Sequence, residues 1–363
     1  MLDMNTYSSV QYGVELAPLT SFGCGGPAER LLQVDAQDLR EVLDSLDEQP
    51  WVLGYGTNVL IADTGLPGTT LLLREGGFSI DERGLLIADS GAWWDDIVAA
   101  AVDTGWWGVE LMSGIPGNVG AAVAGNIAAY GQAVSDRLAW VEVYHNGAVT
   151  RLDPGELDLR YRSSALQAGN LAKAVLLRAA LQLQPEATGE VEYQSLLDTA
   201  ESIGQSTVRL KDRREITLAA RDRAGSLYHH AATGQHRSAG SFFKNPLVTQ
   251  DQAQYVTGFD ESGRSREQVA AQNRIHGGDS ARVPAALVML AAGFRRGQEF
   301  GSVRLHPRHV LKLENTGAAR AQDIYNVAHH IMTVVEDKLH IKLEPEVRFL
   351  GEFESAEVVE GVE

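Results

Sequence analysis

The segment "MSGIPGNVGAAVAGNIAAYG", residues 112–131, decides what kind of fold this sequence encodes. Five of its residues are glycine and five are alanine, so its side chains are too small to fill an ordinary core. Glycine lets a backbone approach a ligand closely, and a large flat molecule can lie against such a stretch. A flexible linker is the alternative, but Ile115, Val119, Val123 and Ile127 make the segment too apolar for one. We interpret it as a loop that lines a cofactor.

A second glycine-rich segment, "GYGTNVL" at residues 54–60, follows the apolar run "WVL". Successive N–H groups in a tight turn can bind phosphate. The segment is not the dinucleotide-binding fingerprint, because no third glycine opens a helix and no βαβ unit follows. Taken alone, it is interpreted first as a hairpin turn, with a phosphate-binding turn as the alternative.

The remaining elements alternate between helical and extended patterns. "DAQDLREVLDSLDE" predicts a helix with Asp35 as its N-cap. "GLLIADSGAWWDDIVAAAVDTG" predicts a strand and then a helix that ends at Gly105, and Asn146-Gly147 predicts a hairpin. Further strands are expected at "KAVLLRAALQLQ" and "PEVRFLGE", and further helices at "LKDRREITLAARDRAG", "VPAALVMLAAG" and "RAQDIYNVAHHIMTVVEDKL". The pattern predicts an α+β protein.

Length and charge limit the function classes. A chain of 363 residues predicts two or three domains. Its 31 basic and 48 acidic side chains give a net charge of −17, which argues against a nucleic-acid-binding protein. We find no membrane span and no signal peptide, so we expect a cytoplasmic protein without a membrane partner.

Metal binding is not expected from this sequence. Cys24 is the single cysteine, so a disulfide framework and a multi-cysteine metal site are both excluded. The histidines include the adjacent pair His329 and His330, which would point to different faces of a helix. The others considered are His229, His230, His236, His306 and His309. No His-x-x-x-His pair supports a site, and we predict no metal.

Three short segments carry possible catalytic side chains. "SAGSFFKNP", residues 238–246, is either a turn with its aromatics packed underneath or a device that places Ser241 at one reacting atom. "LRYRSS" carries Tyr161 and Arg162 at the end of a hairpin region. "LEPEVRFLG" sets Glu346 in an apolar strand, either on a solvated edge or in a dry site. Individually, each segment is also compatible with a structural role.

Together these segments resemble the family of UDP-N-acetylenolpyruvoylglucosamine reductases. The resemblance runs from "LTSFGCGGPAE" at residue 19 to "PEVRFLGE" at residue 352 and includes "GYGTNVL", "GIPGNVGAAVAGNIAAYG", "YRSS", "AGSFFKNP" and "EPEVRF" in family order. The insertion "VEYQSLLD" around Tyr193 resembles the tyrosine-bearing loop of the longer type of this family.

The resemblance implies three α+β parts. Two would form an FAD-binding module of the vanillyl-alcohol-oxidase (PCMH) type, and the third would bind the substrate. The implied division is residues 1–73 with the C-terminal strand 346–353, then 74–229, then the substrate-binding domain 230–345 and an acidic tail at 354–363.

The implied activity is the reduction of UDP-N-acetylglucosamine enolpyruvate to UDP-N-acetylmuramate in peptidoglycan synthesis, with non-covalent FAD and with NADPH as co-substrate. Arg162 would stabilise the developing enolate, Ser241 would donate the proton, and Glu346 would hydrogen-bond the substrate carboxylate. The alternatives are another FAD-dependent oxidoreductase and a non-catalytic sugar-nucleotide-binding protein on the same scaffold.

The resemblance also implies the residues that bind the ligands. For substrate they are Tyr161, Tyr193, Lys244 and Asn245. For FAD they are Gly54, Tyr55, Gly56, Thr57, Asn58, Ser113, Gly114, Ile115, Pro116, Gly117, Gly120, Gly125, Asn126 and Tyr130.

Two departures from the family pattern affect these expectations. A lysine-bearing segment upstream of the serine turn is replaced by "SLYHHAATGQHR", so Lys244, Arg237 or a histidine would neutralise the substrate phosphates. Gly125 stands where many members have glutamine, and Ala128 replaces a glycine. We expect contacts to the flavin there through backbone or water.

Overall fold

A computed structural model of the chain describes residues 10–187, 189–228, 237–260, 263–266, 269 and 280–357. The chain divides into two compact units. The first comprises Met1–Val14, Ala28–Thr57 and Leu66–Thr233, and the second comprises Glu15–Pro27, Asn58–Gly65 and Gly234–Glu363. None of the helices in the described ranges is both long and apolar enough to cross a bilayer.

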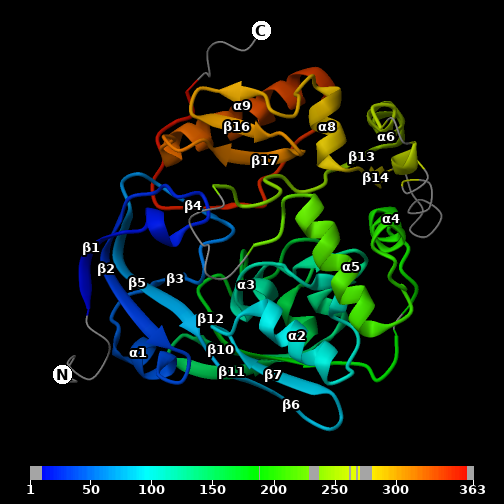
Figure 1. The fold of residues 1–363 in the computed structure, drawn as a ribbon. Coiled ribbons are helices and arrows are strands. Elements are labelled where there is room, and N and C mark those ends of the chain that lie inside the picture. The colour runs from blue at the N-terminus through cyan, green and yellow to red at the C-terminus, as the bar shows by residue number, and fades with distance from the viewer. Residues whose placement is uncertain are drawn as a thin grey trace. The chain divides into compact units, whose positions relative to one another are not determined.

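The first unit contains two main sheets (Figure 1). A four-stranded sheet has the order β1 (Gln11–Glu15), β2 (Pro27–Asp35), β5 (Leu66–Glu75) and β3 (Trp51–Leu53). A five-stranded sheet has the order β11 (Ala148–Leu152), β10 (Leu138–His145), β12 (Val175–Gln182), β7 (Leu85–Asp89) and β6 (Phe78–Ile80). A small pair joins β8 (Ala128–Ala129) to β9 (Gln132–Ala133).

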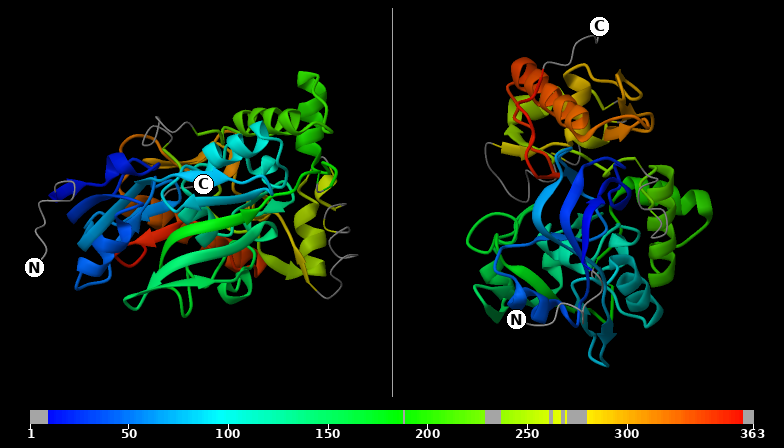
Figure 2. Two further views of the ribbon diagram at one scale, coloured as in Figure 1. Left: turned by 90° about the horizontal axis from the view of Figure 1, so that it is seen from below. Right: turned by 90° about the vertical axis from the view of Figure 1, so that its left-hand side faces the viewer.

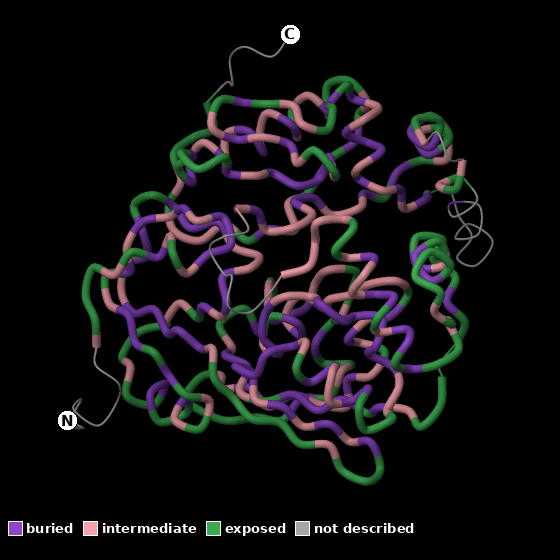
Figure 3. The backbone as a smooth tube through the Cα atoms, viewed as in Figure 1, coloured by how far each residue is buried: buried purple, intermediate pink, exposed green. Residues whose placement is uncertain are grey.

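Pairing differs between these two sheets. In the first, β5 runs parallel to both β2 and β3, whereas the five-stranded sheet is antiparallel throughout. The edge strand β1 is exposed along most of its length (Figure 3). Figure 2, left, views the five-stranded sheet from below.

Helices complete the first unit. They are α1 (Leu39–Ser45), α2 (Trp94–Asp103), α3 (Val119–Ala124), α4 (Gln194–Ile203) and α5 (Leu210–Arg223), with 3-10 turns η2 (Glu110–Met112), η3 (Val134–Asp136) and η4 (Pro154–Leu157). Helix α3 packs on β12 and β7, and α5 packs on α2, α4 and η2. The core between sheet and helices includes Trp94, Ile97 and Val98 of α2 with Val141 and Val143 of β10.

The second unit is built around the antiparallel sheet β15 (Glu299–Phe300), β16 (Val303–His306) and β17 (His309–Asn315). Helices α8 (Ala285–Ala291) and α9 (Ala321–Leu339) pack on this sheet (Figure 1). Its other elements are η1 (Ala17–Leu19), α6 (Gln250–Thr257), the pair β13 (Leu247–Thr249) and β14 (Ser280–Arg282), and the parallel pair β4 (Val59–Ile61) and β18 (Arg348–Leu350).

Most elements expected from the sequence are present. The predicted hairpin is formed by β10 and β11, with Asn146 and Gly147 both at positive φ (53° and 77°). The predicted end of α2 is confirmed by Gly105 at φ 89°. The division into three parts with boundaries near 73 and 230 stays a prediction.

Two expectations were wrong. Asp35 does not cap α1, because it ends β2 and the N-cap position belongs to Asp38. The segment 54–60 is not a hairpin turn, since β3 and β4 join different sheets: β3 pairs with β5, and β4 pairs with β18. The sequence shows two apolar runs around a glycine turn, and partners far along the chain decide the pairing.

Candidate functional site

Within the first unit, residues 54–57 of one glycine-rich segment lie beside residues 116–118 of the other. A Cβ atom on Gly54 would stand 2.6 Å from the side-chain nitrogen of Asn118, so only glycine fits there without a shift. The Thr57 hydroxyl donates to the carbonyl of Pro116 at 3.5 Å. The fold therefore brings together two segments that were singled out separately in the sequence.

Asn118 fixes the second segment in place. Its Nδ2 donates to the carbonyl of Leu73 at 3.0 Å, and its Oδ1 accepts from the N–H of Ala121 at 2.9 Å. The second bond is an N-cap, which satisfies an otherwise unpaired N–H in the first turn of α3. One buried side chain thus joins β5, the glycine turn and the start of α3.

Backbone donors remain available where the two segments meet. The N–H groups of Gly56 and Gly117 have no hydrogen-bond acceptor among the residues that the structure describes. Both glycines have positive φ (63° and 122°), a backbone region that glycine enters without the steric cost of a Cβ. This arrangement suits the pyrophosphate of a dinucleotide cofactor, and Thr57, Ile115 and Pro116 beside it are only half-buried.

Arg162 is presented by a tight and strained turn. The N–H and carbonyl groups of Arg160 and Ser163 exchange hydrogen bonds at 3.0 and 3.2 Å, and Arg162 between them has φ 53°. A non-glycine residue in this region costs roughly 1–3 kcal/mol, so the surroundings must impose the conformation. The Arg162 Nη2 donates to the carbonyl of Ala128 at 2.9 Å, which directs the guanidinium toward the second glycine-rich segment.

Asn126 also holds this turn. Its Nδ2 donates to the carbonyl of Arg160 at 3.0 Å, and its Oδ1 accepts from the N–H of Ser135 at 3.0 Å. Asn126 has φ 40°, a conformation that asparagine tolerates better than most side chains. A residue expected to bind cofactor therefore also positions the expected catalytic arginine.

The predicted tyrosines gather near the same stretch. The rings of Tyr130 and Tyr193 meet edge to face, with centroids 5.7 Å apart. Burial raises the pKa of both hydroxyls, so each remains a hydrogen-bond donor at neutral pH. Tyr161 and Tyr193 keep 38% and 42% of their surface exposed, which leaves them accessible to a ligand.

Sequence reasoning missed Arg221 of α5. Its Nε donates to the carbonyl of Gly114 at 3.1 Å and its Nη2 to that of Ser226 at 3.2 Å. Burial lowers the pKa of its guanidinium, and the charge of Arg162 lowers it further, while Tyr130 raises it. A second cation therefore stands in the field of Arg162 and Tyr130.

Asp95 and Arg214 fix the same loop and were also missed. Asp95 Oδ1 accepts from the N–H of Gly114 at 2.7 Å, and Arg214 forms a two-pronged ion pair with Asp95 at 2.6 and 2.8 Å. Arg214 and Arg221 are seven residues apart and so share one face of α5. That spacing was visible in the sequence, but it did not reveal what the face would meet.

In the second unit, Ser241 and Glu346 are held by adjacent backbone segments. The N–H of Glu346 donates to the carbonyl of Phe242 at 2.8 Å, and Phe243 forms an isolated bridge with Pro345. On the other side, the N–H of Phe242 donates to the carbonyl of Leu311 in β17 at 2.8 Å. Glu346 thus bonds directly to the residue that follows Ser241, although Ser241 and Glu346 are more than 100 positions apart in the chain.

Aromatic packing anchors the serine turn. Phe242 and Phe243 are 0% and 1% exposed, and the Phe242 ring contacts Phe22, Phe243 and Phe349. A Cβ on Gly240 would meet none of the described protein atoms within 4 Å, so crowding by the protein does not require a glycine here. The glycine is needed for its φ of 80°, which turns the chain into Ser241.

Lys244 and Asn245 follow in the same segment. The Lys244 ammonium lies 3.8 Å from the exposed carboxylate of Glu344, a weak pair that a phosphate could replace. The side-chain oxygen of Asn245 accepts from the N–H of Ala285 at the start of α8 at 2.9 Å. That bond gives Asn245 a structural role at the start of α8.

Asn58 and Arg237 occupy other parts of the second unit. Asn58 Nδ2 donates to the carbonyl of Glu346 at 3.1 Å, so an expected cofactor residue supports an expected catalytic one. Arg237 has φ 55°, and its Nη1 stands 2.7 Å from where a Cβ of Gly23 would be. His229, His230 and His236 lie outside the described residues.

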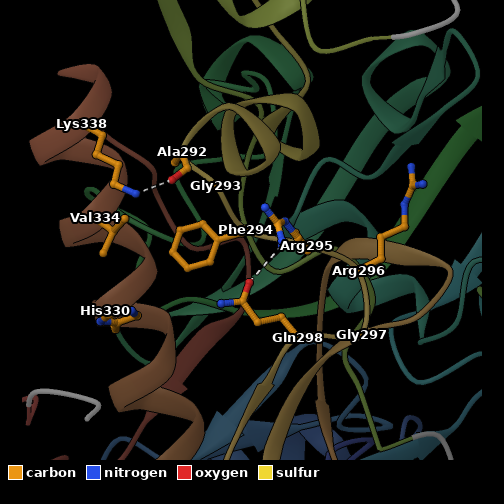
Figure 4. Close-up of a pocket in the computed structure, with 10 residues that line it drawn as sticks. All are labelled: Ala292, Gly293, Phe294, Arg295, Arg296, Gly297, Gln298, His330, Val334 and Lys338. Atoms are coloured by element: carbon orange, nitrogen blue, oxygen red, sulfur yellow. Dashed lines mark hydrogen bonds between the residues drawn. The ribbon is translucent and has the colours of Figure 1, made fainter. Parts of the chain in front are cut away.

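A cavity of 550 Å³ in the second unit contains none of the predicted site residues (Figure 4). It lies between α9 and the loop after α8, where the Lys338 ammonium donates to the carbonyl of Ala292 at 2.8 Å. A cation on the last carbonyls of a helix is a common structural contact. Arg295 and Gln298 close the neighbouring turn, with the Arg295 N–H donating to Gln298 Oε1 at 3.0 Å.

Comparisons with known families and relatives cover nearly the whole chain. Residues 33–153 match the family described as FAD binding domain, and residues 232–350 match UDP-N-acetylenolpyruvoylglucosamine reductase, C-terminal domain. A relative from Mycobacterium leprae (strain Br4923), named UDP-N-acetylenolpyruvoylglucosamine reductase, is 32% identical over 362 residues, covering 94% of this chain and 95% of the relative. A Corynebacterium glutamicum relative (strain ATCC 13032), named UDP-N-acetylenolpyruvoylglucosamine reductase 2, is 33% identical over 93% of each chain.

A solved structure has a similar fold. The crystal structure of UDP-N-acetylenolpyruvylglucosamine reductase from Thermus caldophilus matches with a TM-score of 0.63 and 24% identity, covering 94% of this chain and 99% of that one. The predicted α+β class with an FAD-binding module is confirmed.

Proposed function

Because the chain belongs to the family of UDP-N-acetylenolpyruvoylglucosamine reductases, we propose that Arg162, Ser241 and Glu346 are the side chains with which it reduces its substrate. The substrate is UDP-N-acetylglucosamine enolpyruvate and the product is UDP-N-acetylmuramate, a precursor of peptidoglycan. NADPH is the reductant. Substrate and reductant are both cytoplasmic metabolites, so we place the protein in the cytoplasm.

FAD fits the residues of the first unit. The N–H groups of Gly56 and Gly117 would hold its pyrophosphate, and residues 113–130 would lie along the ring. When bound, the cofactor supplies the hydride that is added to the vinyl methylene carbon of the substrate. The protein contributes position and charge, since loops fixed by Asn118 and Asp95 need little reorganisation when ligands bind.

Arg162 stabilises the charge that hydride addition creates. Negative charge then spreads over the α-carbon and the carboxylate, and a guanidinium can meet a carboxylate oxygen and its neighbour together. The bond from Arg162 Nη2 to the carbonyl of Ala128 orients the guanidinium, whose N–H groups are the donors that would meet the substrate. In a dry site each such bond counts for more than in water.

Glu346 hydrogen-bonds the substrate carboxylate as a donor. Two carboxylates can form a hydrogen bond only if they share a proton, so in this proposal Glu346 is wholly or partly protonated when substrate is bound. Its backbone is fixed on both sides, by its own N–H to Phe242 and by its carbonyl to Asn58.

Ser241 donates the proton to the α-carbon. An unperturbed serine is a very weak acid, but the carbon that it faces is strongly basic, and the nearby cation Lys244 stabilises the alkoxide that forms. The observation that best supports this role is the backbone contact between Phe242 and Glu346, which fixes proton donor and carboxylate binder in one frame.

The decisive experiment measures NADPH oxidation by the purified, FAD-supplemented protein. We expect oxidation to depend on the enolpyruvyl sugar nucleotide and the flavin to be released by acid. Flavin that stays attached after acid treatment would contradict non-covalent binding. Fast oxidation that is independent of the sugar nucleotide would indicate a different FAD-dependent oxidoreductase.

A further inference from the structure

Gly125 has no evident backbone reason to be glycine. It ends α3 with φ −82° and ψ −5°, a conformation that any residue adopts. A Cβ there would stand 3.2 Å from the carbonyl oxygen of Ala121, which is tight but within reach of a small adjustment. What lies beyond that Cβ is the side-chain nitrogen of Gln167, at 3.6 Å. A side chain at position 125 would therefore begin in van der Waals contact with the amide of Gln167 and would compete with it for space.

Gln167 belongs to the segment that presents Arg162. Residues 160–168 are joined to residues 124–128 by three hydrogen bonds. The Ser164 hydroxyl donates to the carbonyl of Ala124 at 2.7 Å. The other two are those of Asn126 with Arg160 and of Arg162 with Ala128. Since Ala165 and Leu166 are buried in the core, the position of Gln167 is set firmly at its backbone.

The side-chain amide of Gln167 has no hydrogen-bond partner among the described residues, although the residue is half-buried. Its main-chain N–H is used, donating to the carbonyl of Ser164 at 3.0 Å. A side-chain amide carries two donor hydrogens and an acceptor oxygen, and ordering its long side chain costs conformational entropy. An amide held beside a loop that lines a ligand is well placed to hydrogen-bond that ligand.

We propose that Gln167 reaches over Gly125 and hydrogen-bonds the polar edge of the flavin ring, serving as the side-chain contact that position 125 lacks. The heterocycle edge has both donors and acceptors, and an amide matches either. This inference rests on the proposed function, because it assumes that FAD lies along residues 113–130. It makes Gln167 a cofactor-binding residue that replaces backbone or water at this point.

The test compares three variants of the FAD-loaded protein: Gln167→Ala, Gly125→Gln, and the double variant. Loss of one ring contact in Gln167→Ala should weaken FAD binding by about three- to tenfold. Gly125→Gln alone should also bind FAD less tightly, because its side chain meets Gln167. The double variant should bind better than either single one, since truncating Gln167 makes room for an amide from position 125. Flavin fluorescence on dilution gives the affinity, and Gln205→Ala, on another half-buried glutamine, which pairs with Glu215, is the matched control.

A second readout separates ring contact from a structural effect. Removing a hydrogen bond to the ring should shift the visible absorption bands of bound flavin in Gln167→Ala, while the thermal unfolding of the flavin-free variant should match the flavin-free parent. Unchanged affinity and unchanged bands would overturn the inference. If the parent protein itself bound no FAD, the proposed function would fail. If the parent bound FAD and Gln167→Ala bound it equally well, only the inference about Gln167 would fail.

Discussion

Arg162 and Ser241 are both presented by residues at positive φ, yet the two turns are held in opposite ways. Besides its own backbone bonds, the Arg162 turn is held by polar side chains: Asn126 donates to the carbonyl of Arg160, and the Ser164 hydroxyl donates to the carbonyl of Ala124. The Ser241 turn is held by backbone bonds and by the buried rings of Phe242 and Phe243. The backbone strain also differs. Arg162 itself has φ 53°, whereas in the serine turn the residue with positive φ is Gly240, which adopts it without strain.

This difference shows how each side chain is prepared for its proposed task. A guanidinium must meet charge that develops over several atoms, and a polar frame fixes its direction through specific hydrogen bonds. A hydroxyl must deliver one proton to one carbon, and a dry, well-packed turn restrains its position. Substitutions in the two turns should therefore have different effects on activity and on stability.

The largest effect is expected from Ser241→Ala. Turnover should fall by about 10²–10⁴, because the proton donor is lost. Reduction of the flavin by NADPH should remain nearly as fast as in the parent, since Ser241 acts later. Stopped-flow absorbance measures both rates. Equal slowing of flavin reduction and turnover would show another role for the serine, and Ser302→Ala serves as the control.

The next test compares the two frames by stability. Phe242→Ala should lower the free energy of unfolding by about 3–5 kcal/mol, since it empties a site at 0% exposure. Asn126→Ala should lower it by about 1–3 kcal/mol through two lost hydrogen bonds. Urea unfolding followed by fluorescence measures both, with Phe259→Ala, on a ring 41% exposed, as the control. A larger loss for Asn126→Ala would reverse the comparison.

Arg162→Lys tests whether the reaction needs the paired N–H groups of a guanidinium or only a positive charge at this position. We expect kcat to fall by about 10- to 100-fold with KM little changed, because the fork matters most as charge develops. Backbone strain is the same for lysine, so the effect reports the side chain. Arg160→Lys, at an exposed arginine paired with Asp158, should stay close to the parent. Activity of Arg162→Lys within a few-fold of the parent would refute the fork.

Variants of Glu346 test whether this side chain carries a proton when substrate is bound. Glu346→Gln keeps a hydrogen-bond donor, whereas Glu346→Ala leaves the substrate carboxylate unpaired at a cost of about 1–3 kcal/mol. Steady-state kinetics of the two variants should therefore show the glutamine enzyme as the more active. If both lose the same activity, Glu346 is not a protonated donor.

The smallest effect concerns pH and the strand that supports Ser241. Burial lowers the pKa of His309 from 6.5 to about 4, and the charges of Lys312 and Arg296 contribute. As pH falls through this window, the unfolded chain takes up a proton that the folded chain does not, so stability falls. His309→Gln should lose less stability than the parent between about pH 7 and about pH 5. Parallel unfolding midpoints for the two proteins across this range would contradict the assignment.

Much of the fold and of the candidate site could be predicted because the patterns are local. The hairpin at Asn146-Gly147 and the end of α2 at Gly105 depend on φ values that few residues adopt. The serine turn was recognisable because apolar rings, glycine and lysine occur within nine residues. Such features need no knowledge of distant partners.

What the sequence did not reveal depends on contacts between distant segments. Asp95 and Arg221 fix the loop at Gly114 from opposite sides, and neither lies in a recognisable motif. Gln167 meets Gly125 only because residues 160–168 fold back onto the end of α3. The hairpin interpretation of residues 54–60 failed for the same reason, since β3 and β4 pair with strands that follow later.

The sequence by itself determined the family and the cofactor class, and it supplied the side chains that we propose as chemically active, because these inferences follow from residue types at fixed spacing. Only the tertiary structure decided which residues hold those side chains in place. Hydrogen bonds and packing act over a few ångströms, and the chain alone does not state which of its distant segments will come that close.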